Sequence, residues 1–142
     1  MIVADLNLLL YAYDALSAPH EAAKQWWIDI LAGPEVVGLC DVVVFGFIRI
    51  TTRRGVYAQP MLIPEVLEIV RSWLNHPNVE MLTPSAKSRA ICFDLLETIG
   101  TGGNLTTDVQ IAALALHARA VVHSNDRDFL RFPGLSVKNP LA

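Results

Sequence analysis

The sequence has few cysteines, no long apolar run and no start that resembles a secretion signal. Its only two cysteines, Cys40 and Cys92, lie in apolar segments and lack the spacing of zinc ligands. They are interpreted as small buried side chains of a protein in a reducing cytoplasm. No apolar run reaches the roughly 18 residues that a membrane-spanning helix requires, and Asp5 interrupts the start where a signal peptide would be apolar. We therefore expect a cytoplasmic protein that does not enter a membrane.

An excess of basic residues is also absent. The formal net charge is −3, from 11 basic and 14 acidic side chains. This balance gives no general attraction to nucleic acid, so binding of RNA would depend on a local group of cations. The sequence contains no internal repeat, low-complexity tract or linker. With 142 residues, of which 53% are hydrophobic, it is long enough for one domain over residues 1–142 with a sizeable core.

Short apolar runs alternate with helical patterns along the chain, which predicts an α/β fold around a parallel sheet. Residues 42–54 are ambiguous, because valine and phenylalanine favour a strand, whereas the spacing of Arg49 and Arg53 and a possible cap at Asp41 favour a helix. We predict a helix there, since parallel strands need a crossover. The expected strands are 2–4, 36–39, 78–82, 120–123 and 135–137, and the expected helices are 8–15, one that starts at 19–21, 42–54, 65–75, 85–97 and 108–119.

Four aspartates are expected at the edge of the sheet where the carboxyl ends of the strands lie, which is where ligands bind in open α/β sheets. Asp5 follows the first strand, Asp108 opens the penultimate helix, and Asp126 and Asp128 follow the strand after it. Each could instead cap a helix, but Asn7 can cap the first helix and leave Asp5 free. Two carboxylates about 4 Å apart repel by about 4 kcal/mol at an effective dielectric near 20. A cluster of them therefore calls for a cation, and oxygen ligands alone favour Mg²⁺ or Mn²⁺ over Zn²⁺.

Three arginines, Arg49, Arg53 and Arg54, gather near the end of the helix expected at 42–54. Two interpretations are open: cations that complement the helix dipole, or contacts to the phosphates of a nucleic acid. The glycine-rich residues 100–103 are interpreted as a simple loop. They lack the lysine of a P-loop and do not follow a strand.

Five motifs occur along the chain in the order of one known family: Asp5-Leu-Asn7-Leu-Leu-Leu-Tyr11, residues 45–52, Leu105-Thr106-Thr107-Asp108 with 111–113, residues 124–129, and Asn139-Pro140-Leu141. With these motifs the chain resembles a PIN-domain ribonuclease and, within that family, a VapC-type toxin of a toxin–antitoxin pair. The resemblance implies a PIN-like three-layer fold with a central parallel sheet of about five strands. It also implies Mg²⁺-dependent hydrolysis of RNA, with 5′-phosphate and 3′-hydroxyl products. A cognate antitoxin that covers the acidic site, anchored on Phe47 and Trp27, and a homodimer are expected as partners.

The resemblance also assigns roles to individual residues. It makes Asp5, Asp108 and Asp126 catalytic, and it places Asp128 with them as a fourth metal ligand. Three polar side chains, Asn7, Thr107 and Ser124, could orient a ligand carboxylate or a bound water. The three arginines, Arg49, Arg53 and Arg54, could contact RNA.

One position departs from the family pattern. Many members carry a glutamate in the helix after the second strand, and Val44 aligns with it here; only Asp41 lies nearby, about one turn upstream. Either this ligand is dispensable, Asp41 substitutes for it, or activity is weakened. The alternatives to a ribonuclease are thus a catalytically weakened PIN-like interaction module and a phospho-receiver signalling domain. The latter would need an acidic pair beside the first strand and a suitably placed lysine.

Overall fold

Five parallel strands form one sheet in the order β3-β2-β1-β4-β5 in the computed structural model, which describes residues 1–142. The strands are β1 (Ile2–Ala4), β2 (Val37–Cys40), β3 (Val79–Leu82), β4 (Val121–His123) and β5 (Ser136–Lys138). The central strand β1 pairs on both sides, since Ile2 aligns with Val37 of β2 and with Val121 of β4. The parallel arrangement therefore brings the carboxyl ends of β1, β2 and β4 to one edge of the sheet.

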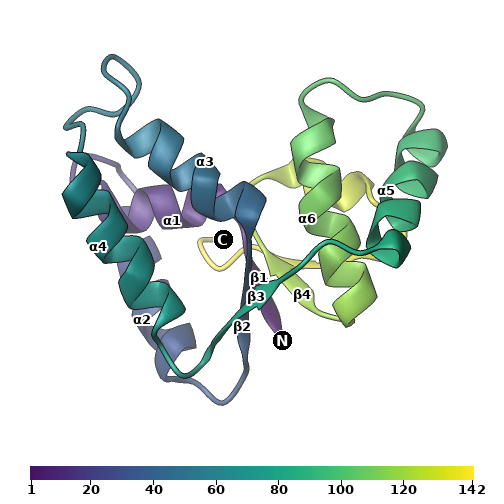
Figure 1. The fold of residues 1–142 in the computed structure, drawn as a ribbon, viewed down its shortest axis with the longest axis horizontal. Helices are drawn as coiled ribbons and strands as arrows, with labels where there is room; N and C mark the ends of the chain where they lie inside the picture. The colour runs from purple at the N-terminus through teal and green to yellow at the C-terminus, as the bar shows by residue number, and fades with distance from the viewer.

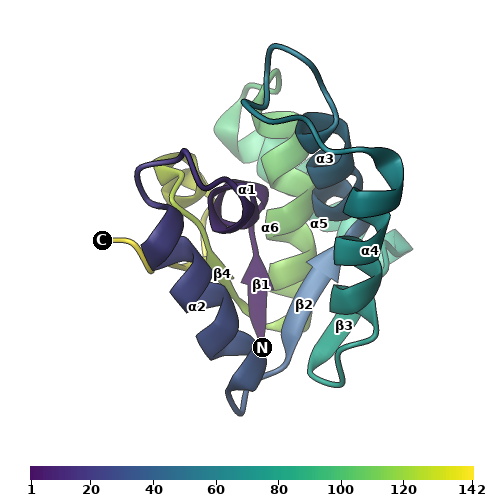
Figure 2. The same cartoon turned by 90° about the vertical axis from the view of Figure 1, so that its left-hand side faces the viewer.

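Helices cover both faces of this sheet. They are α1 (Leu6–Tyr13), α2 (His20–Ala32), α3 (Asp41–Thr51), α4 (Ile63–Leu74), α5 (Ala86–Ile99) and α6 (Leu105–Ala118), with a short 3-10 helix η1 (Arg127–Arg131). Figure 1 shows α1, α2 and α4 on one side of the strands and α5 and α6 on the other. Turned by 90°, the view shows that α1 begins directly above β1 (Figure 2). The predicted three-layer fold with a five-stranded parallel sheet is confirmed.

The ambiguous segment 42–54 is helical, as predicted, although α3 spans Asp41–Thr51 and is preceded by Cys40 as its N-cap residue. Its buried residues include Val43, Val44 and Phe47, a helical spacing that turns one face of α3 to the core. Packing of this face outweighs the strand propensity of the valines. No helix in the chain is both long enough and apolar enough to cross a membrane.

The two helices next to the candidate acids, α1 and α6, begin earlier than predicted. Helix α1 begins at Leu6 rather than Leu8, because Asp5 is its N-cap residue and accepts a hydrogen bond from the Leu6 amide. The prediction that Asn7 caps this helix is wrong. Helix α6 begins at Leu105, so Asp108 lies within its first turn instead of at its start.

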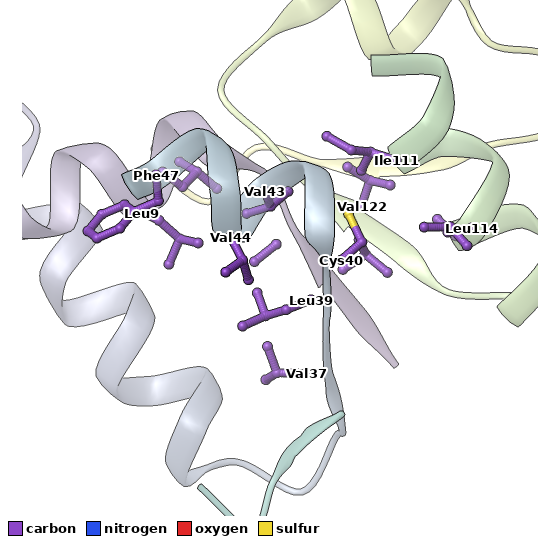
Figure 3. Close-up of a cluster of buried hydrophobic side chains, with 14 of the residues drawn as sticks. Leu9, Val37, Leu39, Cys40, Val43, Val44, Phe47, Ile111, Leu114 and Val122 are labelled. Atoms are coloured by element: carbon purple, nitrogen blue, oxygen red, sulfur yellow. The ribbon is translucent and has the colours of Figure 1, made fainter. Parts of the chain in front are cut away.

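The core is one cluster of 28 buried residues drawn from both layers and from the sheet. Figure 3 shows Leu39 and Val44 lying together beneath α3, with Cys40 turned toward Ile111 of α6. All four residues of β2 are buried, as expected for a strand covered on both faces. Trp27 and Trp73 belong to this core, where their rings pack against each other.

Candidate metal centre

Asp5 lies at the end of β1 and is held from two sides. Its Oδ1 accepts a hydrogen bond from the Leu6 amide at 2.7 Å, and its Oδ2 accepts one from the Ser124 hydroxyl at 2.6 Å. Its own amide donates to the His123 carbonyl of the neighbouring strand at 3.0 Å. With only 5% of its surface exposed, the Asp5 side chain has a fixed position. Asp5 is thus a helix cap and a buried carboxylate at the same time.

The loop after β4 places the next two acids. The Ser124 hydroxyl that donates to Asp5 also accepts a hydrogen bond from the Asp126 amide at 2.9 Å. Asp126 Oδ1 in turn accepts one from the Asp128 amide at 2.9 Å and so caps η1. Through Ser124, the ends of β1 and β4 are therefore joined by side-chain hydrogen bonds.

Asp108, from the first turn of α6, completes the group. Carboxylate oxygens of Asp108, Asp126 and Asp128 lie within 4.8 Å of one another. Asp5 stands outside this closest set, yet its charge still acts on Asp108. The structure thus brings together the four predicted acids, with Asp128 more central and Asp5 more withdrawn than the sequence suggested.

The pKa values of the acids reflect this crowding. Burial raises the pKa of Asp108 to about 7, and the charges of Asp5, Asp126 and Asp128 add to the shift. Burial also raises the pKa of Asp5, against the hydrogen bonds from Ser124 and Leu6 that lower it. Desolvation and mutual repulsion both disfavour the ionised forms. No lysine or arginine side chain of the protein forms an ion pair with these carboxylates.

The donor set fits a hard divalent cation. The only ion pair in the protein joins His20 and Glu21, so no lysine or arginine neutralises the acids of the site. The ligands would all be carboxylate oxygens, which suit Mg²⁺ or Mn²⁺ and exclude the nitrogen and sulfur set of a typical zinc site. Asp108, Asp126 and Asp128 are the residues whose spacing could hold such an ion.

The three polar residues predicted to support the ligands differ in their contacts. Ser124 is buried and bonds both Asp5 and Asp126, as described above. Asn7 accepts a hydrogen bond from the Asn125 amide at 3.4 Å, so it steadies the acidic loop. Thr107 is exposed, and its side chain has no hydrogen-bond partner within the protein.

Sequence reasoning missed two asparagines that fix the same loop. The Asn139 amide group donates to Asn125 Oδ1 at 3.0 Å, while Asn139 Oδ1 accepts from the Leu141 amide. The chain after β5 is thereby tied to the loop that carries Asp126. The closing Asn139-Pro140-Leu141 motif was the one available signal, since a contact between loops is not visible in a linear sequence.

Position 44 cannot provide the glutamate found in many family members. Val44 is 5% exposed and packs in the core beside Leu39 and Leu9 (Figure 3), so a carboxylate there would face apolar side chains. Gly46 of α3 lies against the start of α1, because a Cβ atom added to it would be 2.7 Å from Leu6 Cδ2. The alignment of Val44 with the family glutamate therefore stays a prediction, and the structure shows that this side chain belongs to the core. Asp41 is exposed at the first position of α3 and lies outside the closest acidic set.

The arginine trio lies at the other end of α3. Arg49 is in its last turn, and Arg53 and Arg54 follow its final residue; all three are exposed and free of ion pairs. At 1.5 Å per residue, α3 separates them from the carboxyl end of β2 by about 15 Å. The structure therefore does not bring them into the acidic cluster.

The two residues predicted to anchor an antitoxin are inaccessible. Phe47 is fully buried and Trp27 is 4% exposed. They pack against Trp73, with ring centroids 4.7 and 5.7 Å from it respectively. The prediction that they anchor a partner is wrong, because their surface is already used by the core.

The sequence and the fold are similar to those of known proteins. The sequence profile of the PIN domain matches residues 2–135. Ribonuclease VapC33 of Mycobacterium tuberculosis is 42% identical over 141 residues, which cover 99% of each chain. Ribonuclease VapC37 of the same organism is 34% identical over 142 residues, covering 100% of this chain and 99% of that one. The crystal structure of Mycobacterium tuberculosis VapC20, described as a Sarcin-Ricin loop cleaving toxin, superposes with a TM-score of 0.67 at 19% identity, over 92% of this chain and 93% of that one.

Proposed function

This chain belongs to the PIN-domain family and, within it, to the VapC ribonucleases, and we propose that it is a metal-dependent endoribonuclease that serves as the toxin of a toxin–antitoxin pair. The proposal for its chemistry is hydrolysis of RNA phosphodiester bonds with Mg²⁺, or Mn²⁺ in its place. The supporting observation is the group of Asp108, Asp126 and Asp128, whose oxygens gather within 4.8 Å without a cationic partner.

The residues of the chain have separable tasks in this reaction. Asp108, Asp126 and Asp128 would hold the ion, and Asp5, fixed by Ser124, would add negative charge behind them. When bound, Mg²⁺ supplies a water of lowered pKa and neutralises charge on the phosphate. In the hydrolysis, the water oxygen bonds to phosphorus, the bond to the 3′ oxygen breaks, and that oxygen takes up a proton. The products are a 5′-phosphate and a 3′-hydroxyl.

The geometry favours this function over the two alternatives. A phospho-receiver would need an acidic pair beside β1 and a lysine near it, whereas Asp5 is alone there and bonded to Ser124. The close approach of Asp108, Asp126 and Asp128 without a lysine or arginine among them favours a metal-binding enzyme over an inactive interaction module.

Replacement of the ligands tests the proposal. Purified protein with Mg²⁺ should cleave a mixed RNA pool, and EDTA should stop it. Asp108→Asn and Asp126→Asn should each lower the rate by about a hundredfold or more, because each removes a metal ligand. Asp94→Asn, at an exposed site on α5, is the matched control and should cleave normally. Without metal, Asp108→Asn should be no less stable than the wild type, since it relieves repulsion.

Cleavage by a folded Asp108→Asn/Asp126→Asn double variant at the wild-type rate would rule out this metal site. Cleavage by the wild type in excess EDTA would rule out the metal requirement itself.

We propose three partners for this function: RNA as substrate, a cognate antitoxin as inhibitor, and a second copy of the chain in a homodimer. Solved relatives of the same fold include a VapBC complex from nontypeable Haemophilus influenzae, with a TM-score of 0.68 and 18% identity over the full length of both chains. Several large apolar side chains remain available to protein partners here, among them Leu16, Leu62 and Ile63, which are 67, 68 and 53% exposed. Co-expression with a neighbouring gene product followed by co-purification and sedimentation would test both protein partners.

A further inference from the structure

A cavity of about 290 Å³ opens between the start of α3, helix α5 and the first turns of α6. We infer that this cavity receives one nucleobase of the RNA strand, unstacked from its neighbours, and that it prefers a base with an exocyclic amino group. The inference rests on the proposed ribonuclease function and names a specificity site for it.

The cavity opens at the same edge of the sheet as the acidic site. Its wall includes Cys40, the last residue of β2, whose carboxyl end lies at the edge shared with β1 and β4. Gln110 of the wall follows Asp108 by two residues in α6, so these two side chains project to different sides of the helix. Burial raises the pKa of the Cys40 thiol, and the charges of Asp41 and Asp5 add to the shift, so Asp5 lies within electrostatic range of this wall. An RNA strand that has one phosphate at the acids could thus place a nearby base in the cavity.

The walls suit the flat face of a base. Seven of the 13 lining residues are hydrophobic, and Phe93 among them is 59% exposed, so its ring is accessible to a base. Arg89, one helical turn before Phe93 on α5, lines the same cavity. Single-stranded RNA is recognised by stacking of splayed bases on aromatic rings and guanidinium planes. The volume is at the lower end of ligand pockets, which suits one base better than a larger molecule.

The polar groups at the cavity suit the edge of a base that donates hydrogen bonds. The Gln110 amide nitrogen donates to the Thr106 carbonyl at 3.1 Å, which leaves the Gln110 carbonyl oxygen to accept. The Asp41 carboxylate is a second acceptor on the opposite wall. Adenine N6 and cytosine N4 are amino donors, whereas guanine and uracil carry the carbonyl oxygens O6 and O4 at the equivalent place, and the amino group of guanine lies on its other edge. The site should therefore disfavour uracil.

A side chain of the antitoxin is the competing occupant. The RNA strand is favoured because the only cation of the cavity, Arg89, stands at the rim beside an exposed aromatic ring, and the cavity opens at the same edge of the sheet as the candidate catalytic site. This combination matches the backbone charge and base stacking of single-stranded nucleic acid.

The test combines nucleotide binding with cleavage mapping. In ¹H–¹⁵N NMR titrations, AMP and CMP should shift the Gln110 side-chain amide and the Phe93 backbone amide, and UMP should shift them only at roughly tenfold higher concentration. Phe93→Ala should weaken AMP binding by roughly tenfold. Leu74→Ala, which truncates a 42% exposed residue at the far end of α4, is the control and should leave binding unchanged. In wild-type cleavage of a mixed RNA pool, one position near the cut should be depleted of uridine, and Phe93→Ala and Gln110→Ala should remove this bias.

The possible outcomes distinguish the base site from the ribonuclease function. If the wild type cleaves no RNA, the proposed function fails, and this inference fails with it. If cleavage is normal but Phe93→Ala and Gln110→Ala change neither nucleotide shifts nor the cleavage bias, only the base site is overturned. If these variants weaken antitoxin binding and leave RNA recognition unchanged, the cavity is a protein site and the inference is wrong.

Discussion

Asp108 is the residue where burial and charge conflict most directly. It lies in the first turn of α6 with its carboxylate facing Asp126 and Asp128, and its pKa is raised to about 7, mainly by burial. A group with a raised folded-state pKa holds its proton more tightly than the unfolded chain does. The free energy of unfolding of the metal-free protein should therefore fall as pH rises from about 4 to about 7 through this group.

A cation should reverse this trend. Because Mg²⁺ competes with the proton for Asp108, the stabilisation by Mg²⁺ should be small at pH 5.5 and larger at pH 8. Urea unfolding in Mg²⁺ and in EDTA at the two pH values measures the difference. In Asp108→Asn this pH dependence should be largely lost. Equal stabilisation by Mg²⁺ at both pH values in the wild type would contradict the assignment of Asp108 as a ligand.

Val44 provides a second prediction at the scale of one residue. Val44→Glu should lower the free energy of unfolding by about 3 kcal/mol or more, because it places an unpaired carboxylate in the core. It should not improve the response to Mg²⁺. Phe45→Glu, next to it on the same helix but 65% exposed, is the control and should change stability little. Urea unfolding curves measure both, and a Val44→Glu protein of normal stability would refute the placement of this side chain.

At the scale of one element, α3 links two different features. Its first residue follows the buried strand β2 at the edge that carries the acids, whereas its last turn leads to Arg53 and Arg54. The buried face of α3 fixes the orientation of this helix, so the two arginines stay far from the acids. Only an extended RNA strand could contact both.

If Arg53 and Arg54 contact RNA, they should do so through phosphates beyond the cleavage site. In an Asp108→Asn background, which prevents cleavage, Arg53→Ala/Arg54→Ala should weaken RNA binding and lower the slope of log affinity against log salt by about 0.7 for each phosphate that is no longer neutralised. Arg71→Ala, in the last turn of α4, is the matched control. An unchanged slope would assign both arginines to the interaction with the helix dipole.

At the scale of the whole molecule, a buried hydrogen bond joins one helical layer to the sheet. The Trp26 indole nitrogen in α2 donates to His123 Nδ1 in β4 at 3.0 Å. Burial lowers the pKa of His123, and the charge of Lys138 adds to the shift. His123 is therefore an acceptor that functions only when neutral.

Acid should weaken this connection. Because the folded-state pKa of His123 lies below 6.5, the unfolded chain takes up this proton first, and the free energy of unfolding should fall as pH drops below about 6.5. His123→Asn does not titrate in this range, so it should lose less stability than the wild type between pH 7 and pH 5. The comparison is made in urea with EDTA present, so that other titrations cancel in the difference. An equal loss in both proteins would show that His123 is not responsible.

The sequence by itself determined the α/β class, the five strands, the helical assignment of α3, three acids that follow strands and a fourth acid near the start of a helix. These features depend on local periodicity and on the rule that parallel strands end at a common edge, both of which can be read along the chain. The resemblance of its motifs to the PIN family then indicated the chemistry.

Only the tertiary structure decided which side chains meet. It made Asp5 rather than Asn7 the cap of α1, joined Asp5 to Asp126 through Ser124, and turned Val44 into the core. It also tied Asn139 to Asn125 and formed the cavity between α5 and α6. The physical reason is that a carboxylate can cap, coordinate or do both. The choice depends on the distance and burial of groups more than 100 residues away in the chain, such as Asp5 and Ser124, which folding alone brings together.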